Sequence, residues 1–329
     1  MPVTDIPSLA VGDRVQSEFL VIARIEKQTT NGDPYVLLTL GNSTGRIESA
    51  PIWTDKREWA AGIEPGRVVQ LIGEVTRYDR NGTTKRQLTI TSPPRILPPG
   101  EFDPADFLES IENCTPLWDW IDRQRAAIRS ATLRAVVNVV FGDDAFRLRF
   151  EKTPGSINRH HAKLGGLLLH TYEVASIARN AARTMRADAD LVVAGALLHD
   201  IGKVEAYEVS PSGFGYTPCG LLLGHVVLGA LMLERALARL GEPVCSEGQL
   251  LELQHMILSH HGTLDFGSPV QPMTTEAELV HWADEASAKG ADMMESMDDP
   301  ANFPGGKECS DRKVWRVDRR LWKRPHEWS

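Results

Sequence analysis

The feature of this sequence that most constrains its fold is a change of hydrophobic period on either side of a proline-rich segment. Before residue 93, apolar residues occur in short runs rich in β-branched side chains, a pattern typical of strands. After about residue 104, they recur with the spacing of amphipathic helices. Residues 93–100 contain four prolines, which we expect to stop any strand and to stiffen the connection. The sequence therefore predicts two domains of different classes.

The first domain has the element order of a five-stranded barrel. Strand and turn signals lie at residues 19–25, 31–34, 35–40, 68–75 and 79–84, the last a hairpin with Asn81-Gly82 at its tip. A short helix is expected at residues 54–62, between the third and fourth strands. Five strands with a helix in this place are typical of an OB-fold, which we assign to residues 1–97.

The second domain is predicted to be all-α. Helical periodicity covers residues 117–141, 164–185, 190–199, 221–240, 248–259 and 275–293. We assign residues 98–115 to a Pro-rich linker, 116–300 to the helical domain and 301–329 to a basic, tryptophan-containing tail. The predicted fold class is a multidomain β + α protein, in which an OB-fold barrel precedes an all-α domain.

Charge is unevenly distributed along the chain. The net charge is -8, yet residues 307–329 contain eight Lys or Arg against four Asp or Glu. The global negative charge therefore does not exclude a polyanionic partner. Trp315, Trp322 and Trp328 are interleaved with arginines in this tail. The pattern suits RNA contact, but it equally suits docking on the helical domain or on another subunit of a homo-oligomer.

The composition also indicates the cellular compartment in which we expect the protein. We find no stretch of about 18 apolar residues and no N-terminal signal peptide, so we expect no membrane partner. The four cysteines are scattered and form no Cys-x-x-Cys pair. This argues against a disulfide framework and a cysteine zinc site, and favours the cytoplasm.

Histidines and aspartates at the ends of apolar segments indicate a metal site. His199-Asp200 follows the apolar run 196–198, and seven of the ten histidines fall between residues 170 and 281. Singly, each histidine could be a cap or a satisfied core residue, and Asp200 could be an N-cap. Together they would each need a buried partner, which favours metal ligation. The candidate ligands are His170, His199, Asp200, His225, His260, His261 and Asp284.

A ligand set of imidazoles and carboxylates without thiolates suits transition metals. We expect one or two divalent ions per chain, with manganese as the first candidate and Fe, Co, Ni or Zn as alternatives. A bound divalent ion makes hydroxide available near neutral pH, and we therefore assign a catalytic role to Asp200 as a candidate ligand of such an ion. Lys203 follows about one helical turn later, where it could neutralise a scissile phosphate or be a solvated lysine.

The spacing of His170, the His-Asp-Ile-Gly-Lys segment at 199–203 and Asp284 resembles the HD superfamily of metal-dependent phosphohydrolases. The resemblance implies that His170, His199, Asp200 and Asp284 bind a first ion. It further implies that Asp200 bridges to a second ion bound by His225 with His260, His261 or both, although these histidines could instead face the substrate.

A barrel before an HD domain is similar to the YhaM-type family of bacterial 3′→5′ exoribonucleases. The motifs that carry the resemblance are Gly32-x-x-Tyr35, Thr44-Gly45-Arg46-Ile47, His160-His161-Ala162 and the Gly165-Gly166 turn before His170. The resemblance covers residues 12–295, with Asn42 as a departure where similar barrels often carry Asp. It implies hydrolysis of single-stranded RNA, with single-stranded DNA as a second candidate substrate, to nucleoside 5′-monophosphates.

Substrate contacts are expected in both domains. Before the Gly-Gly turn, His160 and His161 are candidates for contacts with a substrate phosphate or for supporting contacts around the metal ligands, and His161 is our choice for substrate binding. A purely structural role for both is equally open. In the barrel, OB-folds bind single strands through aromatic side chains and a basic groove. The candidates there are Tyr35, Trp53, Tyr78, Arg77, Arg80, Lys85 and Arg86.

Two other functions stay open at this stage. The same metals could serve a nucleotide or cyclic-nucleotide phosphohydrolase with the barrel as a regulatory module. The chain could also be a non-catalytic single-strand-binding protein with a degenerate helical domain. A panel of mononucleotides tests the first alternative, and metal content tests the second.

Overall fold

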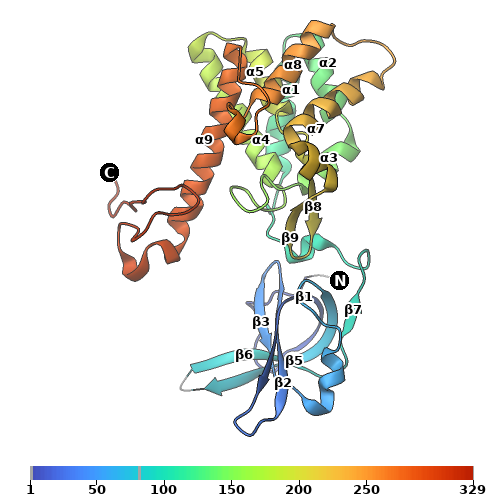
Figure 1. Ribbon diagram of the computed structural model, residues 1–329, viewed down its shortest axis with the longest axis vertical. Helices are drawn as coiled ribbons and strands as arrows, with labels where there is room; N and C mark the ends of the chain where they lie inside the picture. The colour runs from blue at the N-terminus through green and yellow to red at the C-terminus, as the bar shows by residue number, and fades with distance from the viewer. Residues whose placement is uncertain (1–2, 81–82, 329) are drawn as a thin grey trace. The chain divides into compact units, whose positions relative to one another are not determined.

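The computed structural model describes residues 3–80 and 83–328, and the chain divides into two compact units (Figure 1). Residues 1–110 with 209–213 form the first unit, and residues 111–208 with 214–329 form the second. The boundary at residue 110 falls inside the predicted linker.

Five strands of the first unit close into a barrel. They are β1 (Arg14–Gln28), β2 (Pro34–Asn42), β3 (Gly45–Ser49), β5 (Val68–Arg80) and β6 (Thr83–Ile90). β1 pairs antiparallel with β2 and β5, β2 pairs with β3, β5 pairs with β6, and β3 pairs parallel with β6. This ring of pairings returns to β1. The predicted OB-like barrel is confirmed.

Alternating side chains fill the barrel. Phe19, Val21, Leu38, Leu71 and Leu88 are each at most 1% exposed. Burying each contributes about 1.5–3 kcal/mol to folding. The short strand β4 (Ile52–Trp53) pairs with β2, and the 3-10 helix η1 (Thr54–Ala60) follows it. The helix thus lies between the third and fourth barrel strands, as predicted, and the hairpin tip at Asn81-Gly82 lies outside the described residues.

The prediction that the prolines stop every strand is wrong at one point. β7 (Arg95–Leu97) lies between Pro94 and Pro98 and pairs antiparallel with residues 68–70 of β5. Its three residues all retain a backbone N–H, so they can join the ladder that a proline could not. Leu97 is buried with Val68, which attaches the start of the predicted linker to the barrel. A 3-10 helix, η2 (Pro104–Phe107), follows.

The helical unit contains the following helices: α1 (Thr115–Ala127), α2 (Ala131–Phe141), α3 (Asp144–Lys152), α4 (Gly166–Met185), α5 (Ala189–Leu198), α6 (Lys203–Ala206), α7 (Pro218–Ala238), α8 (Glu247–Ser259), η3 (Leu264–Phe266), α9 (Thr275–Asp298), η4 (Pro300–Asn302) and η5 (Pro304–Gly306). The predicted helix at 117–141 is two helices, because Ser130 is extended and its hydroxyl caps α2 by accepting the Leu133 N–H.

Two elements lie outside the predictions. α3 begins after Asp143, whose carboxylate accepts the N–H groups of Ala145 and Phe146. The strands β8 (Tyr207–Ser210) and β9 (Gly213–Tyr216) form a small hairpin within a domain predicted to be all-α. The hairpin is short enough that its strand pattern is hard to distinguish from a loop.

Helix α5 lies inside the helical domain. Its residues 192–198 are all buried, and α4 and α9 pack beside it (Figure 1). A helix that is apolar on every face must be surrounded by other elements. Because His199 and Asp200 follow its last turn directly, α5 places this pair in the interior.

Helix α7 is long and apolar enough to cross a membrane by composition, in contrast to our expectation for the chain. One such helix is weak evidence, because core helices of soluble proteins satisfy the same criterion. The helical conformation of α7 breaks at Gly224, where φ is +73°. The break lies immediately before His225, so it serves the site described below.

The C-terminal tail folds against the end of α9. Phe303, Val314 and Leu321 are buried in a small cluster with Met293 and Met297 of α9. Trp315 is 63% exposed, with the guanidinium groups of Arg159 and Arg316 over its ring. Of the arrangements considered from sequence, the structure shows docking on the helical domain, and RNA contact by the tail stays a prediction.

Candidate metal centre

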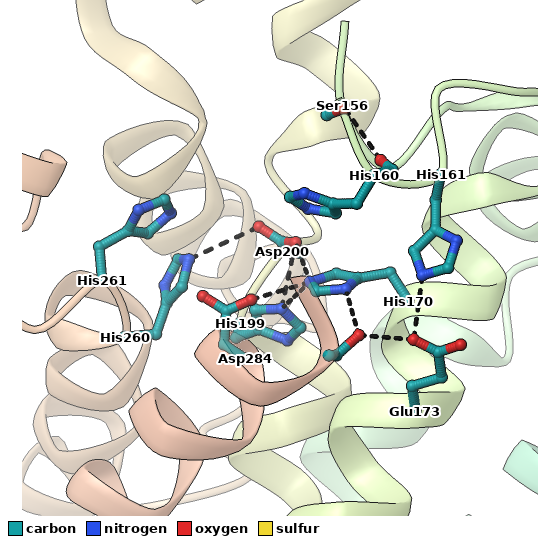
Figure 2. A network of polar contacts seen from close by, with 12 residues as sticks. Ser156, His160, His161, His170, Glu173, His199, Asp200, His260, His261 and Asp284 are labelled. Carbon is teal, nitrogen blue, oxygen red and sulfur yellow. Dashed lines mark hydrogen bonds and ion pairs between the residues drawn. The ribbon is translucent and has the colours of Figure 1, made fainter. Parts of the chain in front are cut away.

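Segments far apart in the sequence bring their ligand side chains to one point in the helical domain (Figure 2). Their nitrogen and oxygen atoms lie within 4.8 Å of one another in three overlapping groups. These groups are His170, His199 and Asp284; His199, Asp200 and His260; and His225, His260 and His261. The structure therefore brings together all the candidate ligands named from the sequence.

Asp200 lies between two sets of histidines. Its Oδ2 is 3.4 Å from His170 Nε2 and 3.1 Å from His199 Nε2. Its Oδ1 is 3.4 Å from His225 Nε2 and 3.6 Å from His260 Nε2. One carboxylate oxygen thus faces each set, which is the geometry that a bridging ligand requires. We call His170, His199 and Asp284 the first half of the centre, and His225, His260 and His261 the second half.

Gly202 allows the second half to approach Asp200. A Cβ atom at this position would lie 1.9 Å from the carbonyl oxygen of His225 and 2.4 Å from the backbone nitrogen of Gly229. Helix α7 therefore packs directly against the backbone of the His-Asp-Ile-Gly-Lys segment. Any larger residue at 202 would push His225 away from Asp200.

Backbone carbonyl groups orient two of the histidines. His199 Nδ1 is 2.7 Å from Ala196 O, and His260 Nδ1 is 2.6 Å from Ile257 O. Since a carbonyl only accepts, Nδ1 carries the proton in each ring, and the lone pair of Nε2 points toward the cluster. This is the tautomer that a metal ligand needs.

The charges of the cluster separate its two halves. Burial alone would raise the pKa of Asp200, but Lys203 and His199 outweigh burial and hold it well below its usual range. Burial alone would lower the pKa of His170, yet its contacts with Asp200 and Asp284 raise it to about 9. Burial lowers the pKa of His225 to about 3. His225 in the second half is therefore neutral and free to bind a metal ion, whereas a metal ion must displace a proton from His170 in the first half.

The donor set fits a divalent metal ion. His260 Nε2 is buried and lacks a hydrogen-bond partner within residues 3–80 and 83–328. A buried polar atom in that state is costly unless something else satisfies it. Imidazole nitrogens and carboxylate oxygens without thiolates suit Mn, Fe, Co, Ni or Zn.

His160 and His161 take different roles in the structure. His161, the predicted phosphate contact, has a left-handed backbone (φ +53°) and turns its ring away, with Nε2 2.9 Å from Glu173 Oε2. The ring of His160 lies 5.4 Å from that of His170 and faces the cluster (Figure 2). The bond to Glu173 makes His161 a supporting residue, one of the roles considered from the sequence, and its contact with a substrate phosphate stays a prediction.

Lys203 lies within the cluster. Its Nζ is 2.6 Å from Asp200 Oδ2 and donates to the Gly155 carbonyl at 2.8 Å. Although burial would lower its pKa, the charge of Asp200 raises it, so Lys203 stays protonated. It is a buried partner of the central carboxylate, and the solvated-lysine alternative does not hold.

The two remaining histidines of the region are not among the candidate ligands. His281 Nδ1 is 2.7 Å from the carbonyl oxygen of His260, so this ring holds the backbone of a candidate ligand. His255 Nε2 accepts the backbone N–H of Met273.

The barrel candidates do not form one patch. Tyr35 and Trp53 pair with ring centroids 5.2 Å apart, and Trp53 is 44% exposed. On the β5–β6 hairpin, Tyr78 lies opposite Lys85 and Arg77 lies opposite Arg86, so the two pairs are on opposite faces.

Two of these arginines are engaged in the barrel itself. Arg77 pairs with Asp79 at 2.9 Å, and Arg86 donates to the carbonyl oxygens of Pro7 and Leu9. The side chain of Arg80 lies outside the described part of the chain.

Comparison with known proteins agrees with this geometry. The HD domain family matches residues 167–289, the segment that carries all seven candidate ligands. The 3′-5′ exoribonuclease YhaM of Bacillus subtilis is 30% identical over 281 residues, which cover 85% of this chain and 86% of that protein. The chain belongs to the YhaM family. YhaM of Bacillus pumilus is 27% identical over 319 residues, 96% of either chain, so the likeness to YhaM extends into the C-terminal tail.

Among solved structures, the HD domain of the L. monocytogenes phosphodiesterase PgpH aligns with 47% of this chain and 80% of its own. The identity is 21% and the TM-score is 0.31. Membership of the YhaM family, together with the HD domain and its cluster of ligand side chains, makes the protein a hydrolase that acts on phosphate ester bonds.

Proposed function

We propose that this protein is a metal-dependent 3′→5′ exoribonuclease that shortens single-stranded RNA and releases nucleoside 5′-monophosphates. The observation that carries the proposal is Asp200, whose two oxygens face two separate sets of histidines. The YhaM relatives supply the class of substrate and the direction of cleavage.

The candidate ligands would hold two metal ions. Divalent ions bound there would lower the pKa of a water molecule and neutralise charge on the phosphate. His170, His199, Asp200 and Asp284 would hold the first ion. Asp200 with His225, His260 and His261 would hold the second. Manganese is our first candidate, and two ions are the occupancy that this ligand set favours.

Two further side chains would contact the substrate phosphate. Lys203 places a permanent positive charge beside Asp200, where it offsets negative charge that the phosphate brings. His160 faces the cluster, and its Nδ1 is buried and unbonded within the described chain. Burial lowers the pKa of His160 to about 3, so its neutral ring would act as a hydrogen-bond donor to a phosphate oxygen.

We assign capture of the single strand to the barrel, with Tyr35 and Trp53 as the stacking pair and Tyr78 and Lys85 as a second contact. Base–aromatic stacking is tolerant of sequence, which suits an enzyme that degrades single strands of any sequence. Single-stranded DNA is a second candidate substrate, the cytoplasm is the expected compartment, and self-association stays open. The four cysteines are free thiols, in agreement with a reducing compartment.

The decisive experiment follows 5′-labelled single-stranded RNA with the full-length protein. The protein is stripped with a chelator, assayed, and assayed again after addition of Mn²⁺. We expect no cleavage in the stripped sample and, after Mn²⁺, a descending ladder with nucleoside 5′-monophosphates as products. The same sample serves as its own folding control.

Three results would contradict the proposal. An immediate release of the labelled 5′ nucleotide would show the opposite polarity. Turnover of free mononucleotides or cyclic nucleotides, but not of RNA, would favour the phosphohydrolase alternative. RNA binding with neither bound metal nor rescue by Mn²⁺ would favour a non-catalytic binding protein.

A further inference from the structure

A chain of polar side chains runs outward from the first half of the metal centre. His170 Nδ1 is 3.0 Å from the Ser287 hydroxyl, and that hydroxyl is 2.6 Å from Glu173 Oε2. The same Glu173 oxygen is 2.9 Å from His161 Nε2. Figure 2 shows these contacts. His170 is fully buried and Ser287 is 4% exposed, so water has little access to the bond between them, whereas the side chain of Glu173 is 30% exposed.

The direction of each bond follows from the chemistry of its members. An ionised carboxylate only accepts, so Ser287 donates its single proton to Glu173 and His161 donates from Nε2. The Ser287 oxygen must then accept from His170, which places a proton on His170 Nδ1. His170 Nε2 then faces Asp284, at 2.9 Å, and Asp200, and its proton is the one that a metal ion would displace.

Glu173 is ionised in this setting. Burial would raise its pKa, but the hydrogen bonds from His161 and Ser287 outweigh burial and lower it. The Glu173 carboxylate thus accepts two hydrogen bonds, and Ser287 connects it to the candidate metal ligand His170.

We propose that Ser287, Glu173 and His161 are positioning residues that hold His170 in the metal-binding tautomer and orientation. His199 and His260 obtain the same support from backbone carbonyls, so His170 is the ligand that depends on a side-chain relay. This proposal rests on the metal centre of the proposed function, but not on the identity of the substrate. Partners of this kind typically change metal affinity by about 10–100-fold when removed.

The test measures affinity for Mn²⁺ alone, by competition with a chelator, in the full chain without RNA. Ser287→Ala should weaken binding of one ion by about 10–100-fold, and Glu173→Gln by about tenfold. Ser287→Thr, which keeps the hydroxyl, should restore most of the affinity. Ser296→Ala is the matched control, because Ser296 is buried in the same helix and its hydroxyl has no partner among the residues described.

A second readout reports the His170 proton directly. In the Zn²⁺-loaded protein with ¹⁵N-labelled histidine rings, the Nδ1–H signals of His170, His199 and His260 should exchange slowly. Ser287→Ala should remove the slow signal of His170 alone, since the other two rings donate to the backbone. A purely structural role for Ser287 would leave this pattern unchanged.

The outcomes separate the two proposals. If the wild-type protein binds no Mn²⁺, the metal centre and the relay both fail. If the wild type binds Mn²⁺ and Ser287→Ala binds it equally well, with all three ring signals intact, the relay alone is overturned.

Discussion

The two halves of the metal centre use the same kinds of ligand but differ in how firmly the fold supports them. In the first half, His170 and His199 are fully buried, and each Nδ1 has a hydrogen-bond partner that orients the ring. In the second half, His260 is buried and oriented in the same way, but His225 and His261 are half-buried, and their Nε2 atoms lie 3.1 Å from each other. The difference indicates a preformed first site and a second site that the metal and substrate complete.

The largest expected effect removes what the halves share. Asp200→Asn should lower kcat by about 10³-fold, equivalent to about 4 kcal/mol, because one ligand of both ions is weakened. Metal analysis should show that both ions are lost together. Full occupancy of either ion in Asp200→Asn would contradict the view that the two halves share this ligand.

The same variant tests the Lys203 contact. Losing the charge of Asp200 leaves the Lys203 ammonium buried without its partner, which costs about 3–5 kcal/mol of unfolding free energy. Asp200→Ala should be destabilised for the same reason. The double variant Asp200→Asn, Lys203→Met should regain stability in a urea titration without regaining activity. A double variant as unstable as the single one would contradict this account.

A paired substitution sharpens the comparison. His170→Gln should weaken the tighter ion by more than about 100-fold, since a ligand matters more than its outer support. His261→Gln should weaken the other ion by about tenfold and leave the first site filled. Calorimetric titration with Mn²⁺ resolves the two events. Equal losses from both variants would show that the halves are one cooperative site.

A smaller effect is expected in the barrel, where we place binding and not chemistry. Trp53→Ala should raise KM for RNA by about tenfold with kcat unchanged, because stacking of one base contributes about 1–3 kcal/mol. Trp282→Ala, in α9 and 52% exposed, is the matched control. A drop in kcat for Trp53→Ala would remove the distinction between the two domains.

The smallest effect concerns the tail beside the first half. Arg316 lies 2.9 Å from Glu295, whose other oxygen is 3.4 Å from the backbone nitrogen of His161. Arg316→Ala should reduce the unfolding free energy by less than about 1 kcal/mol, as for most exposed ion pairs. Thermal unfolding measures this change. A loss of Mn²⁺ affinity as large as that of Ser287→Ala would mean that the relay extends into the tail.

Local patterns determined much of this protein. Alternating strands with a helix after the third are a short-range signal, and they predict the barrel because side chains on a strand alternate in and out. Ligand-type residues at the ends of apolar helices predict the centre, because an apolar helix such as α5 must be buried and takes His199-Asp200 with it. Glu173 and Ser287 also leave a trace, since each follows a ligand by three residues on the same helix face.

The tertiary structure determined the direction in which individual side chains point. Two adjacent histidines give no sign in the sequence of which one enters the site, and the left-handed backbone at His161 turns His160 toward it. The division of Asp200 between two sets of histidines arises where α7 packs against Gly202. The sequence places Ser287 on the same helix face as Asp284, but only the packing of α9 against α4 sets its hydroxyl between His170 and Glu173. Long-range packing sets these directions, because a side chain's partner can lie more than a hundred residues away.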